Sequence, residues 1–307
     1  MKRFIRTILL MLGIILLVCV GLDVYVTCRL QSSHQQKYEG WNEILKKPID
    51  ADMLIMGNSR ALVQYDPAIL DSILDVNCYN LGINGSPLNR QIVKYNIYRL
   101  YQYKPKCIVV NIDCFTLTWR DGYEREQFFP YLTNPFYRKE VRKVEQFSFG
   151  ELYVPLYRYL TYSGIRSLLN ESELDDYLYK GYRGDDWTWD PTAYNKLSSF
   201  HFTVNDTTSE MFDEFLKERN AEGIKILFCY APIYAGFTQK VDNLQEMFDT
   251  YQAIADKYNI PILDYTYDAM CCDTTLFYNA MHLNKTGAEK FSRKFALDLD
   301  SIGIMRE

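Results

Sequence analysis

Histidine is scarce in this chain, and several common sequence features are missing from it. Only three histidines occur among 307 residues, and the eight cysteines stand at no spacing typical of a metal site. The net charge of −5 leaves no excess of basic residues, which argues against nucleic acid as a partner. No internal repeat or low-complexity tract is present. A histidine in a suggestive context therefore carries information.

The composition is that of a globular protein with a large core. Hydrophobic residues make up 48% of the chain, which suits one sizeable domain of roughly 250 residues plus additional segments. Aromatic residues make up 15%, and core packing explains them better than sugar binding does. Cys78, Cys107 and Cys229 lie in apolar segments, which predicts buried thiols. A disulfide that includes the adjacent pair Cys271 and Cys272 remains an alternative.

The N-terminal segment, residues 1–28, has the pattern of a membrane anchor. Three basic residues precede an apolar run, Ile8–Leu22, that continues to Val26. At 1.5 Å per residue, such a helix would cross most of a hydrocarbon core. No small-residue cleavage site follows the run, which favours an uncleaved signal anchor over a cleaved signal peptide. Val18 before Cys19 disfavours lipoprotein processing.

The basic residues also predict an orientation. Lys2, Arg3 and Arg6 before the apolar run place the N-terminus in the cytoplasm and the main domain in the periplasm or outside the cell. We expect residues 29–48 to be a polar linker, partly helical, and residues 49–307 to form the main domain.

Strand-like and helix-like segments alternate along most of the main domain. This alternation predicts a parallel sheet with helices on both faces, a three-layer α/β/α fold. The expected strands are residues 52–56, 78–81, 107–112, 225–231 and 261–264. The expected helices are residues 67–74, 88–103, 209–220, 243–258 and 285–299, the last with Asn284 as N-cap.

The alternation breaks between about residues 116 and 200. This stretch is rich in Tyr, Trp, Arg and Asp, and it is far too long for an ordinary loop. We interpret it as an inserted subdomain above the sheet, a candidate for substrate selection. A structural elaboration unrelated to any site is the alternative.

Three motifs follow strands and therefore belong on one edge of the sheet. Gly57-Asn58-Ser59 follows the first strand, Gly82–Gly85 follows the second, and His282 lies in a loop before the last helix. Ligands of parallel sheets bind beyond the carboxyl ends of the strands. A serine at a strand-to-helix turn and a distant histidine suit nucleophilic acyl chemistry.

These motifs resemble those of the SGNH (GDSL-like) hydrolase superfamily, and within it the membrane-anchored members linked to polysaccharide O-acylation. The resemblance covers roughly residues 52–115 and 225–299. It implies a flavodoxin-like fold with Ser59 as nucleophile and His282 as catalytic base. It also implies an oxyanion hole formed by the N–H groups of Ser59 and Gly85, and it implies no cofactor and no metal.

The chain departs from the family pattern at three places. Asn58 stands where the family usually has Asp, and Asn279 stands three residues before His282 where the family has the aspartate that orients the histidine. Asp273 is an alternative orienting residue. The third family block is not matched, so neither Asn111 nor Asp113 is assigned a role.

Two functions follow from the resemblance. The first is an esterase or O-acyltransferase that acts on acyl esters of a cell-surface glycan, with Ser59, His282 and Asn279 as the catalytic group. The second is a non-catalytic accessory protein of the same fold that binds glycan or a membrane-bound O-acyltransferase. The intact Ser59, Gly85 and His282 favour the enzyme, whereas Asn279 and the missing third block favour the accessory protein.

Overall fold

A five-stranded parallel sheet is the centre of the computed structural model, which describes residues 1–118, 124–161 and 178–305. The order of the strands is β2-β1-β3-β4-β5, and every neighbouring pair is parallel. The strands are β1 (Met53–Met56), β2 (Cys78–Asn80), β3 (Cys107–Asn111), β4 (Lys225–Tyr230) and β5 (Ile262–Asp264). This order is that of flavodoxin-like doubly wound sheets, which confirms the predicted fold class.

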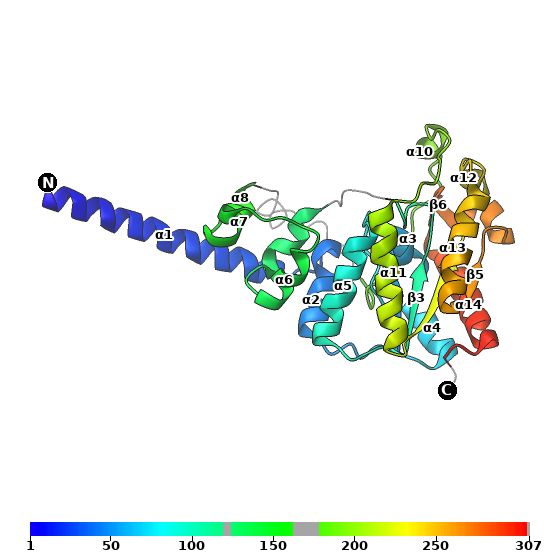
Figure 1. Ribbon diagram of the computed structural model, residues 1–307. Helices are drawn as coiled ribbons and strands as arrows, with labels where there is room; N and C mark the ends of the chain where they lie inside the picture. Colours follow the sequence, from blue (N-terminus) through cyan, green and yellow to red (C-terminus); the bar gives the residue numbers. More distant parts are fainter. Residues whose placement is uncertain (119–123, 162–177, 306–307) are drawn as a thin grey trace. The chain divides into compact units, whose positions relative to one another are not determined.

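Helices cover both faces of the sheet (Figure 1). Alternate side chains of β4 enter opposite layers: Phe228 stacks on Phe212 with ring centroids 5.5 Å apart, whereas Leu227 belongs to the core that contains Phe291. One layer contains α5 (Leu88–Tyr101), α11 (Asp206–Ala221) and α13 (Leu244–Tyr258). The other contains α3 (Ser59–Gln64), α4 (Pro67–Leu74) and α14 (Lys285–Ile302).

Local capping explains where several of these helices begin. Asn284 accepts a hydrogen bond from the N–H of Gly287, so it is the N-cap of α14, as the sequence predicts. Helix α11 begins earlier than the apolar stripe indicates, because Asn205 caps it by accepting from the N–H of Thr208. The remaining short helices here are α10 (Thr192–Asn195), α12 (Ala235–Thr238), η3 (Ala269–Cys272) and η4 (Thr274–Leu276).

His282 lies in a short hairpin and not in an open loop. β6 (Phe277–Asn279) pairs antiparallel with β7 (His282–Leu283), and Asn279 stands directly opposite His282. Strands of two or three residues have no periodicity that a sequence pattern can reveal, which is why this hairpin was not expected. Its effect is to hold Asn279 and His282 side by side before α14 begins.

The chain divides into two compact units. The sheet and its helices belong to Lys47–Tyr123 and Leu178–Glu307, whereas Met1–Lys46 and Glu124–Tyr177 form the other unit. The segment expected to be a linker contains α2 (Gln36–Lys46), which is packed into this other unit through the hydrogen bond from Trp41 Nε1 to Gln127 Oε1, 3.0 Å long. The segment expected to be one insertion, residues 116–200, is shared between the units, and parts of it lie outside the described residues.

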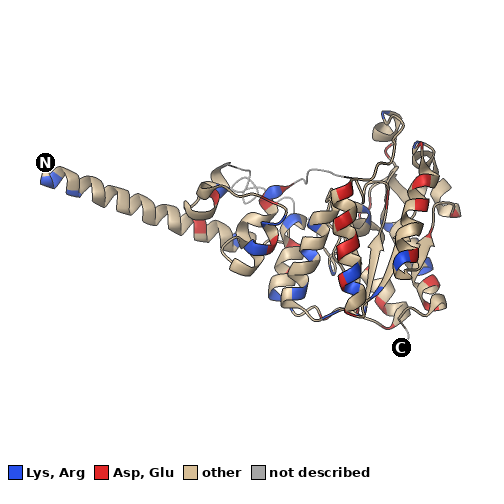
Figure 2. Ribbon diagram, viewed as in Figure 1, with Lys and Arg blue, Asp and Glu red and all other residues tan. Residues whose placement is uncertain are grey.

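The first unit is built around a long N-terminal helix. It contains α1 (Lys2–Leu30), α2, η1 (Arg125–Tyr131), α6 (Pro135–Val141), α7 (Phe149–Tyr153) and α8 (Tyr157–Thr161). Helix α1 is long and apolar enough to cross a membrane, and its central part carries no charged residue (Figure 2). Its first buried side chains, Val26 and Thr27, come near its end.

All eight cysteines are free thiols in this structure. Cys78, Cys107 and Cys229 are buried in the sheet, as the apolar pattern of their segments predicts. Burial raises the pKa of both Cys107 and Cys229 to about 12, so these thiols are inert packing residues.

Candidate active site

Ser59 occupies the first position of a helix at the carboxyl edge of the sheet. Strand β1 ends at Met56, and α3 begins at Ser59 after a two-residue turn. Asn58 is the N-cap, and its Oδ1 accepts a 3.0 Å hydrogen bond from the N–H of Arg60. The turn therefore presents the Ser59 side chain at the edge where parallel sheets bind their ligands.

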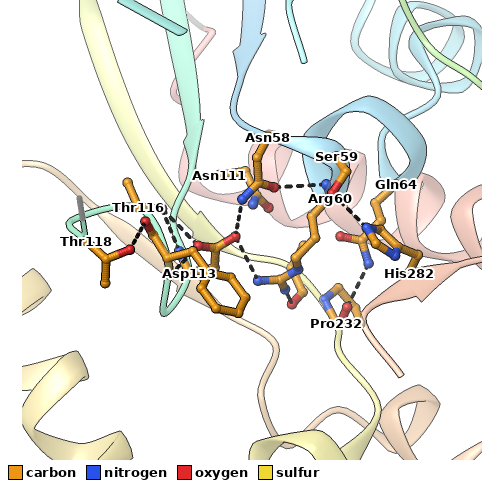
Figure 3. A network of polar contacts seen from close by, with 12 residues as sticks. Asn58, Ser59, Arg60, Gln64, Asn111, Asp113, Thr116, Thr118, Pro232 and His282 are labelled. Atoms are coloured by element: carbon orange, nitrogen blue, oxygen red, sulfur yellow. Dashed lines mark hydrogen bonds and ion pairs between the residues drawn. The ribbon is translucent and has the colours of Figure 1, made fainter. Parts of the chain in front are cut away.

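The structure brings Ser59 and His282 together although 223 positions separate them in the sequence. Ser59 Oγ and His282 Nε2 are 2.8 Å apart, which is hydrogen-bonding distance (Figure 3). This is the separation that a serine nucleophile and its general base require.

Asn279 determines which nitrogen of His282 carries the proton. Its Oδ1 accepts hydrogen bonds from the backbone N–H groups of Met281 and His282, at 2.9 and 3.1 Å. Two N–H donors at one atom identify it as the amide oxygen, because the NH₂ group cannot accept. The same Oδ1 lies 3.0 Å from His282 Nδ1. Nδ1 must therefore donate its proton to Asn279, which leaves the lone pair of Nε2 for the Ser59 hydroxyl.

The surroundings of His282 favour the neutral imidazole. Burial, together with the positive charges of Arg60 and Arg183, lowers the pKa of His282 to about 3. Among the described residues, no carboxylate contacts its ring, whose partners are Asn279 and Ser59. Histidine is therefore in the base form at neutral pH, but the imidazolium that forms during proton transfer has no counter-charge.

A stack of aromatic side chains fixes the plane of the His282 imidazole. The ring of Tyr278 stacks on that of His282 at 5.3 Å between centroids and an angle of 6°. Trp187 packs edge-on against Tyr278 at 5.3 Å, and the guanidinium of Arg183 lies 5.7 Å from the centre of the Trp187 ring. Trp187 and Arg183, which belong to the expected insertion, thus support the aromatic ring that stacks on His282.

A small cavity adjoins Ser59 and His282. Its volume is about 170 Å³, and its lining includes Asn84, Gly85, Gln91, Phe115 and Met281 besides the serine and the histidine. Gly85 has a φ of 57°, a conformation that favours glycine. The backbone N–H groups of Ser59 and Gly85 form no hydrogen bond with any described residue, and both residues line this cavity. They are thus available to an oxygen atom bound there.

A buried polar network lies beneath Ser59, and sequence reasoning assigned it no role. Asn58 Nδ2 donates to Asp113 Oδ2 over 2.7 Å, and Arg60 Nη1 lies 3.8 Å from the same oxygen. Asp113 Oδ1 accepts from the N–H of Phe115 and from the Thr116 hydroxyl. The available signal was the position of Asp113 just after a buried strand, in the region of the unmatched third block.

The other residues considered from the sequence lie elsewhere. Asn111 is buried and accepts from the Tyr65 hydroxyl at 2.8 Å, away from the cavity. Asp273 is not the partner of His282, because Nδ1 of His282 is bonded to Asn279, whereas Asp273 Oδ1 accepts from the N–H and hydroxyl of Thr275 and caps η4. Within the described ranges, no group of three or more His, Cys, Asp or Glu residues could hold a metal ion.

No family model matches the chain, and no curated protein matches it in sequence. Several solved structures resemble it in fold. A G-D-S-L family protein from Desulfitobacterium hafniense is 12% identical, with 80% of this chain and 97% of that chain covered and a TM-score of 0.41. An acetyl xylan esterase is 10% identical, with 81% and 98% covered and a TM-score of 0.43.

A GDSL-like lipase from Bacteroides thetaiotaomicron is 12% identical, with 86% of this chain and 97% of that chain covered and a TM-score of 0.40. Identities and TM-scores this low assign no substrate to the present chain. These three structures are described as a G-D-S-L family lipolytic protein, an acetyl xylan esterase and a GDSL-like lipase.

Proposed function

We propose that this chain is a serine esterase or O-acyltransferase whose nucleophile is Ser59 and whose general base is His282. The observation that carries the proposal is the 2.8 Å contact between Ser59 Oγ and His282 Nε2, with the other ring nitrogen bonded to Asn279. Nε2 can then only accept, so the serine proton has a defined destination. A structural serine–histidine pair would not require this tautomer.

The acyl-transfer step follows from these positions. Ser59 Oγ attacks the carbonyl carbon of an ester while its proton moves to His282 Nε2. The carbonyl oxygen becomes an oxyanion, and the N–H groups of Ser59 and Gly85 are the donors proposed to stabilise it, each worth about 3 kcal/mol. His282 returns the proton to the departing alcohol. Water or a second hydroxyl then takes the acyl group from Ser59.

Asn279 weakens this mechanism less than its identity suggests. In serine proteases, replacing the orienting aspartate by asparagine costs about 10⁴ in rate and leaves the histidine in the wrong tautomer. Here the backbone N–H groups of Met281 and His282 fix the amide so that its oxygen faces Nδ1. The tautomer is therefore correct, and only the stabilising charge is missing.

The cavity favours a short acyl group. At about 170 Å³ it is smaller than the roughly 300–1,000 Å³ of sites for drug-sized ligands. Its lining includes the polar residues Asn84, Ser86 and Gln91. The proposed substrate is a small acyl ester of a cell-surface glycan, which agrees with the family resemblance. Helix α1 would anchor the protein, with its N-terminus in the cytoplasm and the catalytic unit outside.

The second candidate function is that of an accessory protein that binds glycan or a membrane-bound O-acyltransferase. One observation favours it: the pKa of His282 is lowered to about 3 and no carboxylate contacts its ring among the described residues. A site with so little stabilisation of the imidazolium fits a retained fold with lost catalysis.

The experiment that separates the two functions is hydrolysis of a small activated acetyl ester by the full chain in detergent. The enzyme predicts a slow rate that Ser59→Ala and His282→Ala each abolish. The matched control is Ser72→Ala, because Ser72 is an exposed serine on α4. The accessory function predicts a rate that Ser59→Ala leaves unchanged.

A further inference from the structure

Five exposed apolar side chains lie on α7, on the residue that follows it and on α8, all in the first unit. Phe149 and Tyr153 are one helical turn apart, with ring centroids separated by 5.1 Å. The ring of Tyr157 lies against Gly150, where an added Cβ would approach it to 2.8 Å. We call the set of Phe149, Tyr153, Val154, Tyr157 and Leu160, all of which are exposed, the aromatic patch. Such a patch marks an interaction surface.

Hydrogen bonds to Asp23 and Thr27, one helical turn apart, attach the segment that carries the patch to α1. The N–H of Leu156 donates to Asp23 Oδ1 over 2.9 Å, and Arg158 Nη2 donates to Asp23 Oδ2 over 2.6 Å. Thr27 and the Tyr159 hydroxyl share a further hydrogen bond of 2.7 Å. Leu156 has a φ of 68°, which is uncommon for a non-glycine residue, and its hydrogen bond holds the turn between α7 and α8 in that conformation.

Asp23 is also where the exposed apolar part of α1 ends. Almost every side chain from Thr7 to Leu22 is exposed, and no charged residue lies between Arg6 and Asp23 (Figure 2). These residues span about 24 Å at 1.5 Å each, which is most of the hydrocarbon thickness of a bilayer. The patch is therefore attached at the level where α1 would leave the hydrocarbon.

We propose that the aromatic patch lies in the interfacial layer of the membrane that α1 crosses. This proposal depends on the proposed anchoring of the protein by α1. Tyrosine and phenylalanine side chains are suited to this layer, because their rings are apolar and tyrosine adds a polar hydroxyl at the headgroup level. The Asp23–Arg158 ion pair supplies no net charge to oppose the approach.

The test uses the full chain in phosphatidylcholine vesicles that contain lipids brominated on the upper acyl chain. Phe149→Trp places an indole in the patch. The control is Phe136→Trp, because Phe136 is similarly exposed (66% against 74%) but belongs to α6, whose Tyr137 packs on Trp41 of α2, beyond the end of α1. The parent chain has four tryptophans, so the fluorescence of the new indole is obtained by subtracting the emission of the parent chain from that of each variant.

The expected result is loss of most of the added emission of Phe149→Trp in brominated vesicles, with little loss for Phe136→Trp. Tyr153→Trp should behave like Phe149→Trp. Equal quenching of Phe149→Trp and Phe136→Trp, or no quenching of either, overturns the proposal. Protection of Phe149→Trp from both brominated lipid and a soluble quencher shows that a protein covers the patch, and it also overturns the proposal.

Flotation of the vesicles separates this proposal from the anchoring on which it rests. A chain that fails to float with vesicles overturns the anchoring and the patch together. A chain that floats while its patch stays unquenched retains α1 as anchor and overturns only the surface contact.

Discussion

The amide of Asn279 shows how one residue can keep geometry while it loses charge. Aspartate and asparagine have nearly the same shape, and the turn from Asn279 to His282 needs an oxygen acceptor for the N–H groups of Met281 and His282. Either residue supplies that oxygen. The difference between them is therefore confined to the electrostatic stabilisation of protonated His282.

Restoring the carboxylate should raise the rate. We predict that Asn279→Asp increases the acylation rate of a small activated ester about tenfold or more, because a neighbouring carboxylate favours the imidazolium by one to three pKa units. The measurement is pre-steady-state hydrolysis by the full chain. The double variant with Ser59→Ala should be inactive, and an unchanged rate in Asn279→Asp would indicate a site that has lost its other catalytic parts.

The pH dependence of kcat/KM should differ between the wild type and Asn279→Asp. Burial and two arginines lower the pKa of His282 to about 3, so the base form is complete above about pH 4. We predict that kcat/KM of the wild type changes little between about pH 5 and pH 7. In Asn279→Asp the raised pKa of His282 should produce a decline as the pH falls through that range. A wild-type profile that declines near pH 6.5 would contradict the lowered pKa.

The pair Asn58 and Asp113 allows a second test at this scale. Asp113→Asn should lower the free energy of unfolding by about 3 kcal/mol, because it removes the counter-charge of buried Arg60 and turns two NH₂ groups toward each other. Adding Asn58→Asp supplies a carboxylate that can accept from the NH₂ group at position 113 and restores a negative charge near Arg60. The double variant should therefore recover most of the lost free energy of unfolding. Thermal unfolding of the single and double variants measures the coupling, and additive losses would refute it.

The sequence predicted Ser59, His282, Asn279 and Gly85 because each belongs to a short motif beside a strand or helix. It could not assign Asp113 or Arg60. Their roles depend on a contact between the turn after β1 and the segment after β3, and no local pattern encodes such a contact. The stacking of Tyr278 on His282 depends on the β6–β7 hairpin, whose short strands leave no periodicity in the sequence.

At the scale of elements, the five strands were found to within one residue at each end. β1, β3 and β4 were recognisable because parallel strands buried on both faces are continuous apolar runs. The β6–β7 hairpin was missed. The stretch after residue 177 was interpreted only as part of an insertion, yet it contacts the edge of the sheet: the N–H of Asn80 in β2 donates to the carbonyl of Lys180 over 2.9 Å.

Gly181 is the residue that permits this approach. A Cβ at position 181 would lie 1.9 Å from the backbone oxygen of Asn80, whereas a Cβ at Gly223 would meet nothing within 4 Å. Both glycines have positive φ, at 79° and 71°, so they share the conformational cost of substitution, about 1–2 kcal/mol.

We therefore predict that Gly181→Ala reduces both the melting temperature and the rate of ester hydrolysis. The added Cβ would displace the segment of Arg183 and Trp187, and Trp187 would lose its packing position against Tyr278. Gly223→Ala should lower the melting temperature only slightly and leave hydrolysis unchanged. Thermal melts and ester-hydrolysis rates of the two variants test this prediction. Equal effects of the two substitutions would mean that the contact at β2 does not support the site.

At the scale of the whole molecule, the arrangement into two units was not predictable from the order of the sequence. The first unit combines residues 1–46 with residues 124–177, and such a combination depends on long-range contacts. Buried contacts such as the hydrogen bond from the Tyr131 hydroxyl to Asn42 Oδ1, 2.7 Å long, join these two stretches.

The proposed topology has its own test. Because Lys2, Arg3 and Arg6 precede the apolar helix, we predict that the full chain remains with membranes after a high-salt wash. A reporter fused after Glu307 that works only outside the cytoplasm should be active. Activity of a reporter that works only in the cytoplasm at the same position would reverse the orientation.

The central claim is that His282 makes Ser59 a nucleophile, and covalent trapping tests it most directly. The full chain is treated with a fluorophosphonate probe, and the modified peptide is identified by mass spectrometry. The account predicts a single adduct on Ser59, absent in Ser59→Ala, strongly slowed in His282→Ala and unaffected by Ser72→Ala. An unmodified Ser59, or an equal rate of modification with and without His282, would contradict it.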